Sequence, residues 1–167
     1  GKHQVYDFEV LGKPHQLAIW GKGNANPEQI IEDIKKIVVA EADIYHELPY
    51  DHYIFLLHQS ASGFGGLEHK NCCSLIYPRF GFRSTEKYNR FMQLVAHEFF
   101  HLWNVKRIRP KALETFDYTQ ENYTTDLWFA EGTTSYYDVL LPLRSGVYNA
   151  RTCLDNLGKD ITRYWNT

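Results

Sequence analysis

Two short runs of alternating apolar and polar residues open the chain, QVYDFEV (4–10) and HQLAIW (15–20). Alternation with a period of two residues is typical of β-strands whose two faces differ in exposure. The segment LGKP between the runs has the composition of a turn. The pattern therefore predicts a β-hairpin near the N-terminus.

The apolar period changes to that of a helix after the loop GKGNANPEQ. Asn26 can cap the start of this helix, and Pro27 fits its first position. We expect an amphipathic helix that runs to about Tyr45, because apolar residues recur at helical spacing at Ile30, Ile31, Ile34, Ile37 and Val38.

The middle of the chain has the pattern of short strands separated by glycines. YIFLLH (53–58) is a fully apolar strand candidate, and SASGFGG (60–66) is a flexible, glycine-rich loop. The following LEHKNCCSLIYP (67–78) predicts one strand or a tight pair of strands. Cys72 and Cys73 are adjacent there, so their side chains should face opposite sides of the sheet.

Helical patterns dominate the second half. Ser84 can cap a helix that carries residues 93–107. A third helix should begin near Thr125 or Asp126 and run to about Leu141, because Pro142 interrupts the pattern. The end of the chain is also helical in character. Strands first and helices after predict an α+β fold.

Composition limits the classes of function. The chain has 167 residues, which suits a single domain spanning residues 1–167. A formal charge of −2 gives no reason to expect a nucleic-acid partner, and no apolar run is long enough to span a membrane. Three cysteines, an odd number, argue against a disulfide framework. The start GKHQVYDFEV lacks a signal-peptide pattern, which slightly favours a cytoplasmic location.

The segment QLVAHEFFHLWNVKR (93–107) is apolar but carries two histidines and a glutamate at its centre. His97 and His101 are four residues apart, so on a helix both rings share one face and can bind one zinc ion. Glu98 lies at the edge of that face, where it can act as a general base without being a ligand. This is the HExxH arrangement. The alternative is two core histidines bonded to backbone carbonyls, with Glu98 at the surface.

A catalytic zinc site requires a third protein ligand, and LWFAEGTTSYY (127–137) offers Glu131. This carboxylate follows three apolar residues in a helical run, where a buried charge is costly without a cation nearby. Gly132 would let another element approach closely, which favours a buried Glu131. The alternative is a surface glutamate near a helix start, where the helix dipole favours it.

Three motifs, HEFFHLWNVKRIRP, FDYTQENYTTDLW and FAEGTTSYYD, resemble the signature of the glycyl aminopeptidase family, which are gluzincin metallopeptidases. The resemblance covers about residues 63–137. It implies that His97, His101 and Glu131 are zinc ligands and that Glu98 is the base and later the proton donor. It also implies a thermolysin-like catalytic domain, a small sheet packed beside zinc-binding helices. Family members carry a β-rich domain before this region and a PDZ domain after it, and neither is expected within these residues.

The segment GFGGLEHKN lies where related gluzincin aminopeptidases carry a Gly-x-Met-Glu-Asn strand. By this resemblance Gly65 and Gly66 permit close approach of an extended peptide, and Glu68 holds its free α-amino group. Leu67 and His69 replace the methionine and asparagine of the family pattern. The alternative is a turn followed by an exposed Glu68 on an edge strand.

These features predict a zinc-dependent aminopeptidase that acts on peptides with small N-terminal residues, glycine above all. One alternative is a zinc metallo-endopeptidase with the same metal site and no amino-terminal anchor. The other is a non-catalytic, zinc-containing module that binds peptides. The partners we expect are a peptide substrate and the flanking domains of the protein's own full-length chain.

We also expect this chain to be a poor catalyst by itself. Related gluzincin aminopeptidases supply an oxyanion donor from a tyrosine in a Ser-Tyr-Tyr-x-Lys-Gly-like segment downstream of the third ligand. The chain has SYY at residues 135–137, but Asp138 and Val139 follow in place of that pattern. The donor is therefore expected beyond residue 167, and one missing donor typically costs about 10²- to 10³-fold in turnover.

Overall fold

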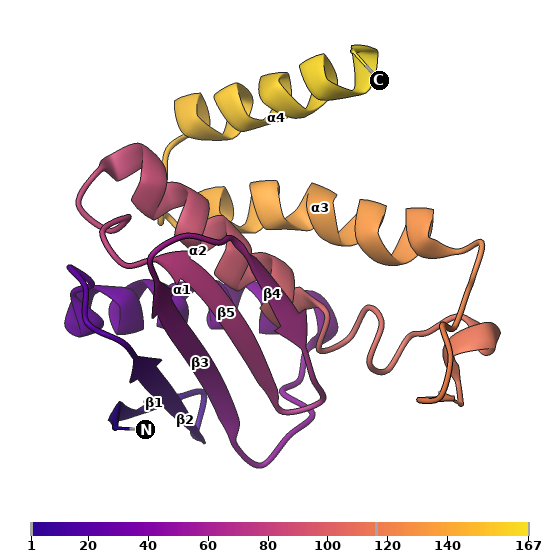
Figure 1. Ribbon diagram of the computed structural model, residues 1–167, viewed down its shortest axis with the longest axis horizontal. Helices are drawn as coiled ribbons and strands as arrows, with labels where there is room; N and C mark the ends of the chain where they lie inside the picture. Colours follow the sequence, from indigo (N-terminus) through magenta and orange to yellow (C-terminus); the bar gives the residue numbers. More distant parts are fainter. Residues whose placement is uncertain (1, 116, 167) are drawn as a thin grey trace.

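A five-stranded sheet forms one layer of the protein, and helices cover one of its faces (Figure 1). The computed structural model describes residues 2–115 and 117–166. The strand order is β1-β2-β3-β5-β4, and the strands are β1 (His3–Val10), β2 (Lys13–Trp20), β3 (Tyr53–Ser60), β4 (Gly65–Glu68) and β5 (Cys72–Pro78). The β2–β3 and β3–β5 pairs are parallel, while the pairs at the two edges are antiparallel.

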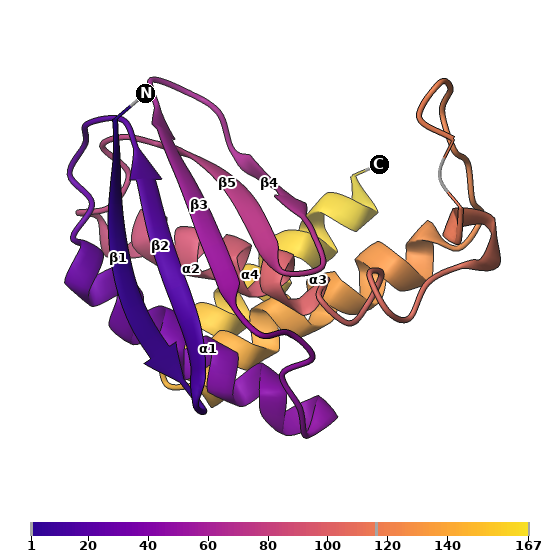
Figure 2. The ribbon, with the colours of Figure 1, turned by 90° about the horizontal axis from the view of Figure 1, so that it is seen from below.

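Four α-helices and one short 3₁₀ segment complete the described residues. They are α1 (Pro27–Tyr45), α2 (Thr85–Phe100), the 3₁₀ segment η1 (Lys111–Leu113), α3 (Leu127–Arg144) and α4 (Ala150–Trp165). Helices α1 and α2 pack on the sheet, and α3 packs on α2 (Figure 2). No helix of the described residues is both long and apolar enough to cross a bilayer. The α+β fold class is confirmed.

The N-terminal half follows its sequence pattern closely. The predicted hairpin is the β1–β2 pair, and its turn places Leu11 and Gly12 at positive φ. The Asn26 side chain accepts hydrogen bonds from the backbone N–H groups of Glu28 and Gln29, so it caps α1 as predicted. Burial follows the predicted apolar stripe, because Ile34 and Ile37 are fully buried.

Three predicted boundaries are wrong. Gly65 and Gly66, predicted in a loop, belong to edge strand β4, which pairs with β5 through the register Gly66↔Leu75. Helix α2 ends at Phe100 rather than continuing through residue 107. Tighter bonds replace the helical ladder there, such as the Trp103 N–H to the Phe100 carbonyl at 3.1 Å.

Pro142 does not end α3, which continues to Arg144. A proline removes one helical hydrogen bond, and near the C-terminal end of a helix few bonds follow for it to disturb. The Pro142 carbonyl accepts hydrogen bonds from the backbone N–H groups of Val147 and Tyr148 beyond the helix. Pro142 therefore lies inside the last turn of α3, and its carbonyl binds the chain that follows the helix.

The core fixes α2 against the sheet. Phe55 on β3 and Leu75 on β5 are fully buried, and they pack in one cluster with Phe91, Val95 and Phe99 of α2. Phe99 and Phe55 have ring centroids 5.7 Å apart. This face of α2 is therefore locked to the strands, which leaves the C-terminal end of the helix directed toward β4 and α3.

Glu41 on α1 is an acidic residue within this interior. Its side chain is fully buried, and neither carboxylate oxygen has a hydrogen-bond partner among the described residues. Burial, followed by the nearby charge of Asp138, raises the pKa of Glu41 well above its usual 4.5. The folded protein therefore holds this proton more tightly than the unfolded chain. Its contribution to stability is complete below about pH 4.5 and is lost as the pH rises toward the folded pKa.

The variant Glu41→Gln should remove this pH dependence, because glutamine is neutral at every pH. Above pH 4.5 the free energy of unfolding of the metal-free wild type should fall by up to about 1.4 kcal/mol per pH unit from this group, and the variant should lack that component. Denaturant unfolding with a chelator present, at a series of pH values, measures both. Glu47→Gln, at an exposed position, is the matched control. Parallel pH curves for wild type and Glu41→Gln would contradict the assignment.

Candidate metal centre

Three potential metal ligands converge where the end of α2 meets α3. His97 and His101 come from α2 and the residue directly after it, and Glu131 comes from the second turn of α3. The two Nε2 atoms lie 3.1 Å apart. Glu131 Oε2 lies 3.3 Å from His97 Nε2 and 3.6 Å from His101 Nε2. The predicted helical spacing thus brings both rings to one point, and a second helix supplies a carboxylate there.

The separations between these donor atoms suit a zinc ion. Ligand atoms about 2.0 to 2.1 Å from a tetrahedral zinc are about 3.3 Å from one another. The three observed separations lie close to that value. Two imidazole nitrogens and one carboxylate oxygen are also a known donor set for catalytic zinc, which keeps a fourth position open. The residues therefore fit the metal that the motif predicts.

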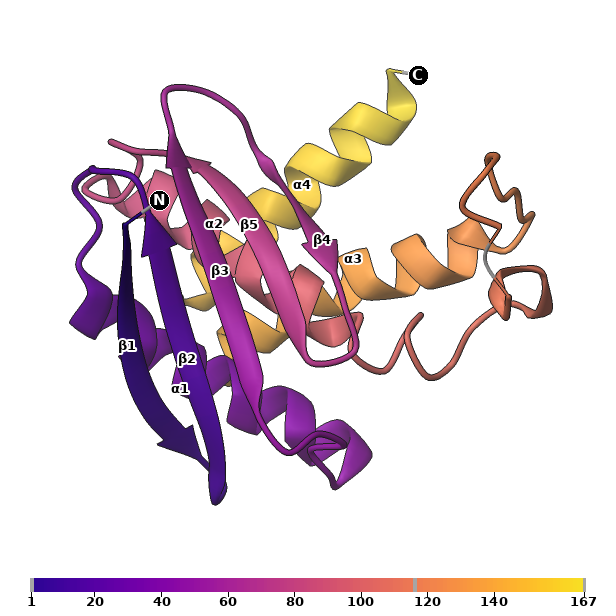
Figure 3. The ribbon, with the colours of Figure 1, turned by 60° about the horizontal axis from the view of Figure 1, so that its bottom comes forward.

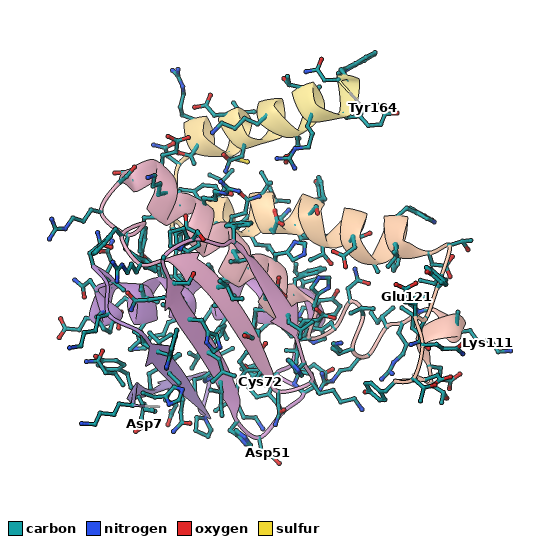
Figure 4. The ribbon with its side chains drawn as sticks, viewed as in Figure 1. Asp7, Asp51, Cys72, Lys111, Glu121 and Tyr164 are labelled. Carbon is teal, nitrogen blue, oxygen red and sulfur yellow. The ribbon has the colours of Figure 1, made fainter. Side chains whose placement is uncertain are left out.

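Cysteine plays no part in this arrangement. The described residues contain two groups of potential ligands, His97–His101–Glu131 and Glu68–Glu98–His101, and neither includes a thiol. Cys72 lies on the sheet (Figure 4), and its neighbour Cys73 is buried on the opposite face.

Each histidine ring is oriented by a hydrogen bond at its other nitrogen. His97 Nδ1 lies 2.7 Å from Asp138 Oδ2, and His101 Nδ1 lies 2.7 Å from the backbone oxygen of Asn104. In both contacts the ring N–H can donate, and in the neutral ring that a metal requires the Nε2 atom then carries the lone pair directed at the centre. Such outer partners are the usual support of metal-binding histidines.

Asp138 escaped the sequence prediction. It lies seven residues after Glu131, on the same face of α3, and it is almost completely buried. Its Oδ1 accepts a hydrogen bond from the Gln93 side chain on α2 at 2.8 Å. One feature of the sequence could have identified Asp138. It is a carboxylate within the apolar stretch YYDVLLP, two helical turns after the candidate ligand Glu131.

Asn104 connects the two helices on the other side of the centre. Its side-chain amide donates to the Ala130 carbonyl at 3.0 Å and to Thr134 Oγ1 at 3.1 Å, both on α3. Its backbone oxygen meanwhile accepts from His101. One residue therefore holds the ring of His101 and the helix that carries Glu131.

Glu131 is more exposed than predicted. Its side chain is 54% exposed, and a Cβ at Gly132 would meet no atom within 4 Å. The expectation of a buried carboxylate with another element packed at Gly132 is wrong, because the first turns of α3 project beyond the sheet and α2 (Figure 3). The alternative of a surface position near a helix start is correct in its exposure. That alternative did not include the contact of Glu131 with the imidazole rings of His97 and His101.

Charges around the centre favour a cation. Burial opposes charge on the His97 ring, but the hydrogen bonds to Asp138 and then Glu131 prevail and raise the pKa of His97 to about 10. Hydrogen bonds to His101 and His97 lower the pKa of Glu131 below its usual range. The carboxylates of Asp138 and Glu131 thus stabilise positive charge on or between the two histidine rings. Either protons or a metal ion can supply that charge.

Glu98 lies beside the three candidate ligands and faces the sheet. It is 4% exposed, and its Oε2 atom has no hydrogen-bond partner among the described residues. Burial raises the pKa of Glu98 to about 7, with the two neighbouring histidines opposing that shift. The alternative that placed Glu98 at the surface is therefore wrong. A carboxyl group with a pKa near neutrality can both take and return a proton.

Gly66 on β4 makes room for Glu98. A Cβ built on Gly66 would lie 2.3 Å from the carboxyl carbon of Glu98, far inside contact distance. Edge strand β4 contacts α2 directly, so the backbone of this glycine forms one wall of the Glu98 site. The sequence prediction assigned Gly66 a role in the approach of a peptide substrate. In the structure, the space that a side chain at Gly66 would fill is occupied by Glu98. Gly65 next to it has a φ of +154° and open space at its Cβ position.

Glu68 lies at the end of β4, close to the centre. Its carboxylate forms an ion pair with Lys106 at 2.9 Å, and both side chains are 21% exposed. Burial acts to raise the pKa of Glu68, but the bonds from Lys106 and from the Glu68 backbone outweigh it and lower the pKa. The edge-strand position matches the sequence prediction. The half-buried ion pair with Lys106 was not foreseen.

Comparison with known proteins gives two findings. The family model for M61 glycyl aminopeptidase matches residues 90–167, a segment that contains His97, His101, Glu131 and Asp138. The crystal structure of an aminopeptidase N family protein from Idiomarina loihiensis is similar to the chain, with 34% sequence identity and a TM-score of 0.86. The similarity covers 92% of this chain and 27% of that protein's chain. No curated protein matches the sequence.

The variant Gly66→Ala should displace the Glu98 carboxylate, because its new methyl group occupies the space now held by that side chain. Overpacking of this kind typically costs about 1–3 kcal/mol of stability. Denaturant unfolding measures the cost, and a crystal structure of the variant measures the displacement. Gly158→Ala on α4, where a Cβ meets open space, is the control. An unmoved Glu98 with unchanged stability would contradict the packing described here.

The variant Asp138→Asn should weaken metal binding, because it removes the negative charge that orients His97 and increases its basicity. Loss of such an outer partner typically costs about 10- to 100-fold in metal affinity. Competition with a chromogenic zinc chelator measures the dissociation constant. Asp155→Asn, on the exposed α4, should leave the affinity unchanged. Equal affinity in both variants would show that Asp138 does not support the centre.

Proposed function

We propose that the chain is the zinc-binding catalytic region of an aminopeptidase of the M61 glycyl aminopeptidase family, whose model matches residues 90–167. Its substrates would be peptides with small N-terminal residues, glycine above all. The observation that carries the proposal is the convergence of His97, His101 and Glu131, with Glu98 buried beside them. Members of one fold family can differ in activity, so the site rather than the fold is the basis of the proposal.

Within this proposal each residue has a separate task. His97, His101 and Glu131 would hold the zinc ion, and Asp138 and Asn104 keep the two rings in position. When bound, zinc polarises the scissile carbonyl and lowers the pKa of water. Glu98 would take a proton from the attacking water and deliver it to the leaving amine.

The substrate would bind along β4. This strand pairs with β5 on one side only, so its outer edge can accept an extended peptide through backbone hydrogen bonds. The backbone of Gly65 and Gly66 would form part of that edge, and the missing side chain of Gly66 leaves room for Glu98. Glu68, at the end of the strand, would accept the α-amino group of the first residue. The peptide's first scissile bond would then lie next to Glu98 and the metal.

One observation favours the endopeptidase as a second candidate. The Glu68 carboxylate already has a cation, Lys106, at 2.9 Å, so an incoming ammonium group is not its first partner. A comparison of free and N-acetylated peptides separates the two activities. The non-catalytic binding module is less well supported, because a buried, unpaired Glu98 costs stability and serves no purpose in binding alone.

The weak activity of the isolated chain stays a prediction. Tyr137 stacks on Phe100 with ring centroids 4.8 Å apart, which gives it a packing role on α3. We propose that the tyrosine donor of the oxyanion site lies elsewhere in the protein. The thermolysin-like arrangement and the flanking domains implied by the resemblance are proposals of the same kind. Phe116, which opens one of the family-like motifs, lies outside the described residues.

Two variants test the proposal together. Glu131→Ala should lose zinc, because two ligands remain where three are needed. In the full-length protein, Glu98→Gln should keep the zinc ion and lose about 10²- to 10⁴-fold in turnover, since only proton transfer is removed. Elemental analysis and hydrolysis of a glycyl anilide measure the two effects. Full zinc content in Glu131→Ala would refute its role as a ligand, and loss of zinc in Glu98→Gln would make Glu98 a ligand rather than a base.

A further inference from the structure

Lys106 places its ammonium group beside the proposed anchor for the substrate amino group. Its Nζ atom lies 2.9 Å from Glu68 Oε1, and both side chains are mostly buried. Neither the sequence motifs nor the zinc chemistry assigns this lysine a task. Among the described residues its only ionic partner is Glu68, which belongs to the proposed substrate site. The ion pair therefore suggests a role for Lys106 in that site.

The backbone around Lys106 is held firmly. Its N–H donates to the His101 carbonyl at 3.0 Å, and its carbonyl accepts from the Arg109 side chain at 3.0 Å. Arg107, next to it, donates to the carbonyls of Leu102 and Pro49. The segment after α2 is thus tied to the metal-binding turn and to the loop before β3. Lys106 therefore approaches Glu68 from a fixed base.

Without a cation nearby, the negative charge of the Glu68 carboxylate would be unfavourable at this position. Its carboxylate, that of Glu98 and the ring of His101 have ligand atoms within 4.8 Å of one another. Two carboxylates so close repel each other, and in a partly buried site the repulsion is weakly screened. Lys106 offsets this repulsion and holds Glu68 in its ionised form. A second metal ion is not required there, because the lysine already supplies the charge.

We propose that Lys106 is a positioning residue for the amino-terminal subsite, an inference that rests on the proposed aminopeptidase function. By pairing with one oxygen of Glu68, Lys106 fixes the carboxylate at the end of β4. A carboxylate has several lone pairs, so one ammonium partner leaves it able to accept another. The substrate ammonium then meets an acceptor that is already oriented, which reduces the entropy cost of binding.

The test is a ratio of two dissociation constants, measured by calorimetry on the zinc-loaded chain. Triglycine amide is compared with its N-acetyl derivative, in a Glu98→Gln background so that the peptide is not cleaved. The free amine should bind at least roughly tenfold more tightly, through a charge-assisted bond to Glu68. Lys106→Met should reduce that preference about tenfold, and Lys106→Arg should restore most of it because arginine can also pair with a carboxylate.

A matched control removes a similar ion pair elsewhere. Lys159 and Glu86 form a pair at 3.1 Å between α4 and the start of α2, with both side chains exposed. Lys159→Met should leave the ratio unchanged. Zinc content, measured on every variant, should stay at one per chain, so that a change in the ratio reports on the peptide site alone.

The outcomes separate two kinds of failure. A preference that is lost in Glu68→Gln but unchanged or increased in Lys106→Met overturns the positioning role and leaves the aminopeptidase proposal intact. An increase in particular would mean that the lysine competes with the substrate. A preference that survives Glu68→Gln overturns the proposed anchor itself, and the role of Lys106 with it.

Discussion

The candidate centre depends on the contact between Asp138 of α3 and His97 of α2, across a 2.7 Å hydrogen bond. This bond directs the other nitrogen of His97 at the candidate metal position and joins the two helices that carry the candidate ligands. Asn104 does the same for His101 from the opposite side, through its backbone to the ring and through its amide to α3. Each histidine ring is oriented by a hydrogen bond at its other nitrogen, and the three donor atoms lie at zinc-like separations.

The sheet supplies the other half of the site. Buried aromatic and aliphatic contacts lock α2 to β3 and β5, so the helix cannot shift relative to the strands. Edge strand β4 then passes Glu98 at a glycine, and the absence of a side chain at Gly66 is what allows the carboxylate to be buried there. The same strand ends at Glu68 and has a free outer edge. The proposed general base and the proposed peptide-binding edge therefore both depend on the position of this one short strand.

The sequence was most informative where a local period determines geometry. The hairpin, the N-cap of α1 and the shared face of His97 and His101 follow from spacing alone. The candidate third ligand, Glu131, was predicted from its helical context, but its exposure could not be predicted, because burial depends on which elements lie nearby. Asp138, Lys106 and the role of Gly66 depend on contacts between segments distant in sequence. Short-range patterns carry no information on such contacts, which arise only when α2, α3 and β4 pack together.

X-ray absorption at the zinc edge, on the chain loaded with one equivalent of zinc, tests the central claim most directly. The ligand set described here predicts two imidazole nitrogens and oxygen donors as the nearest neighbours, all at about 2.0 to 2.2 Å. In the Glu131→Ala variant the imidazole signal of any remaining zinc should persist while the oxygen contribution changes. A sulfur neighbour at about 2.3 Å, or a shell without imidazole, would contradict a metal centre built from His97, His101 and Glu131.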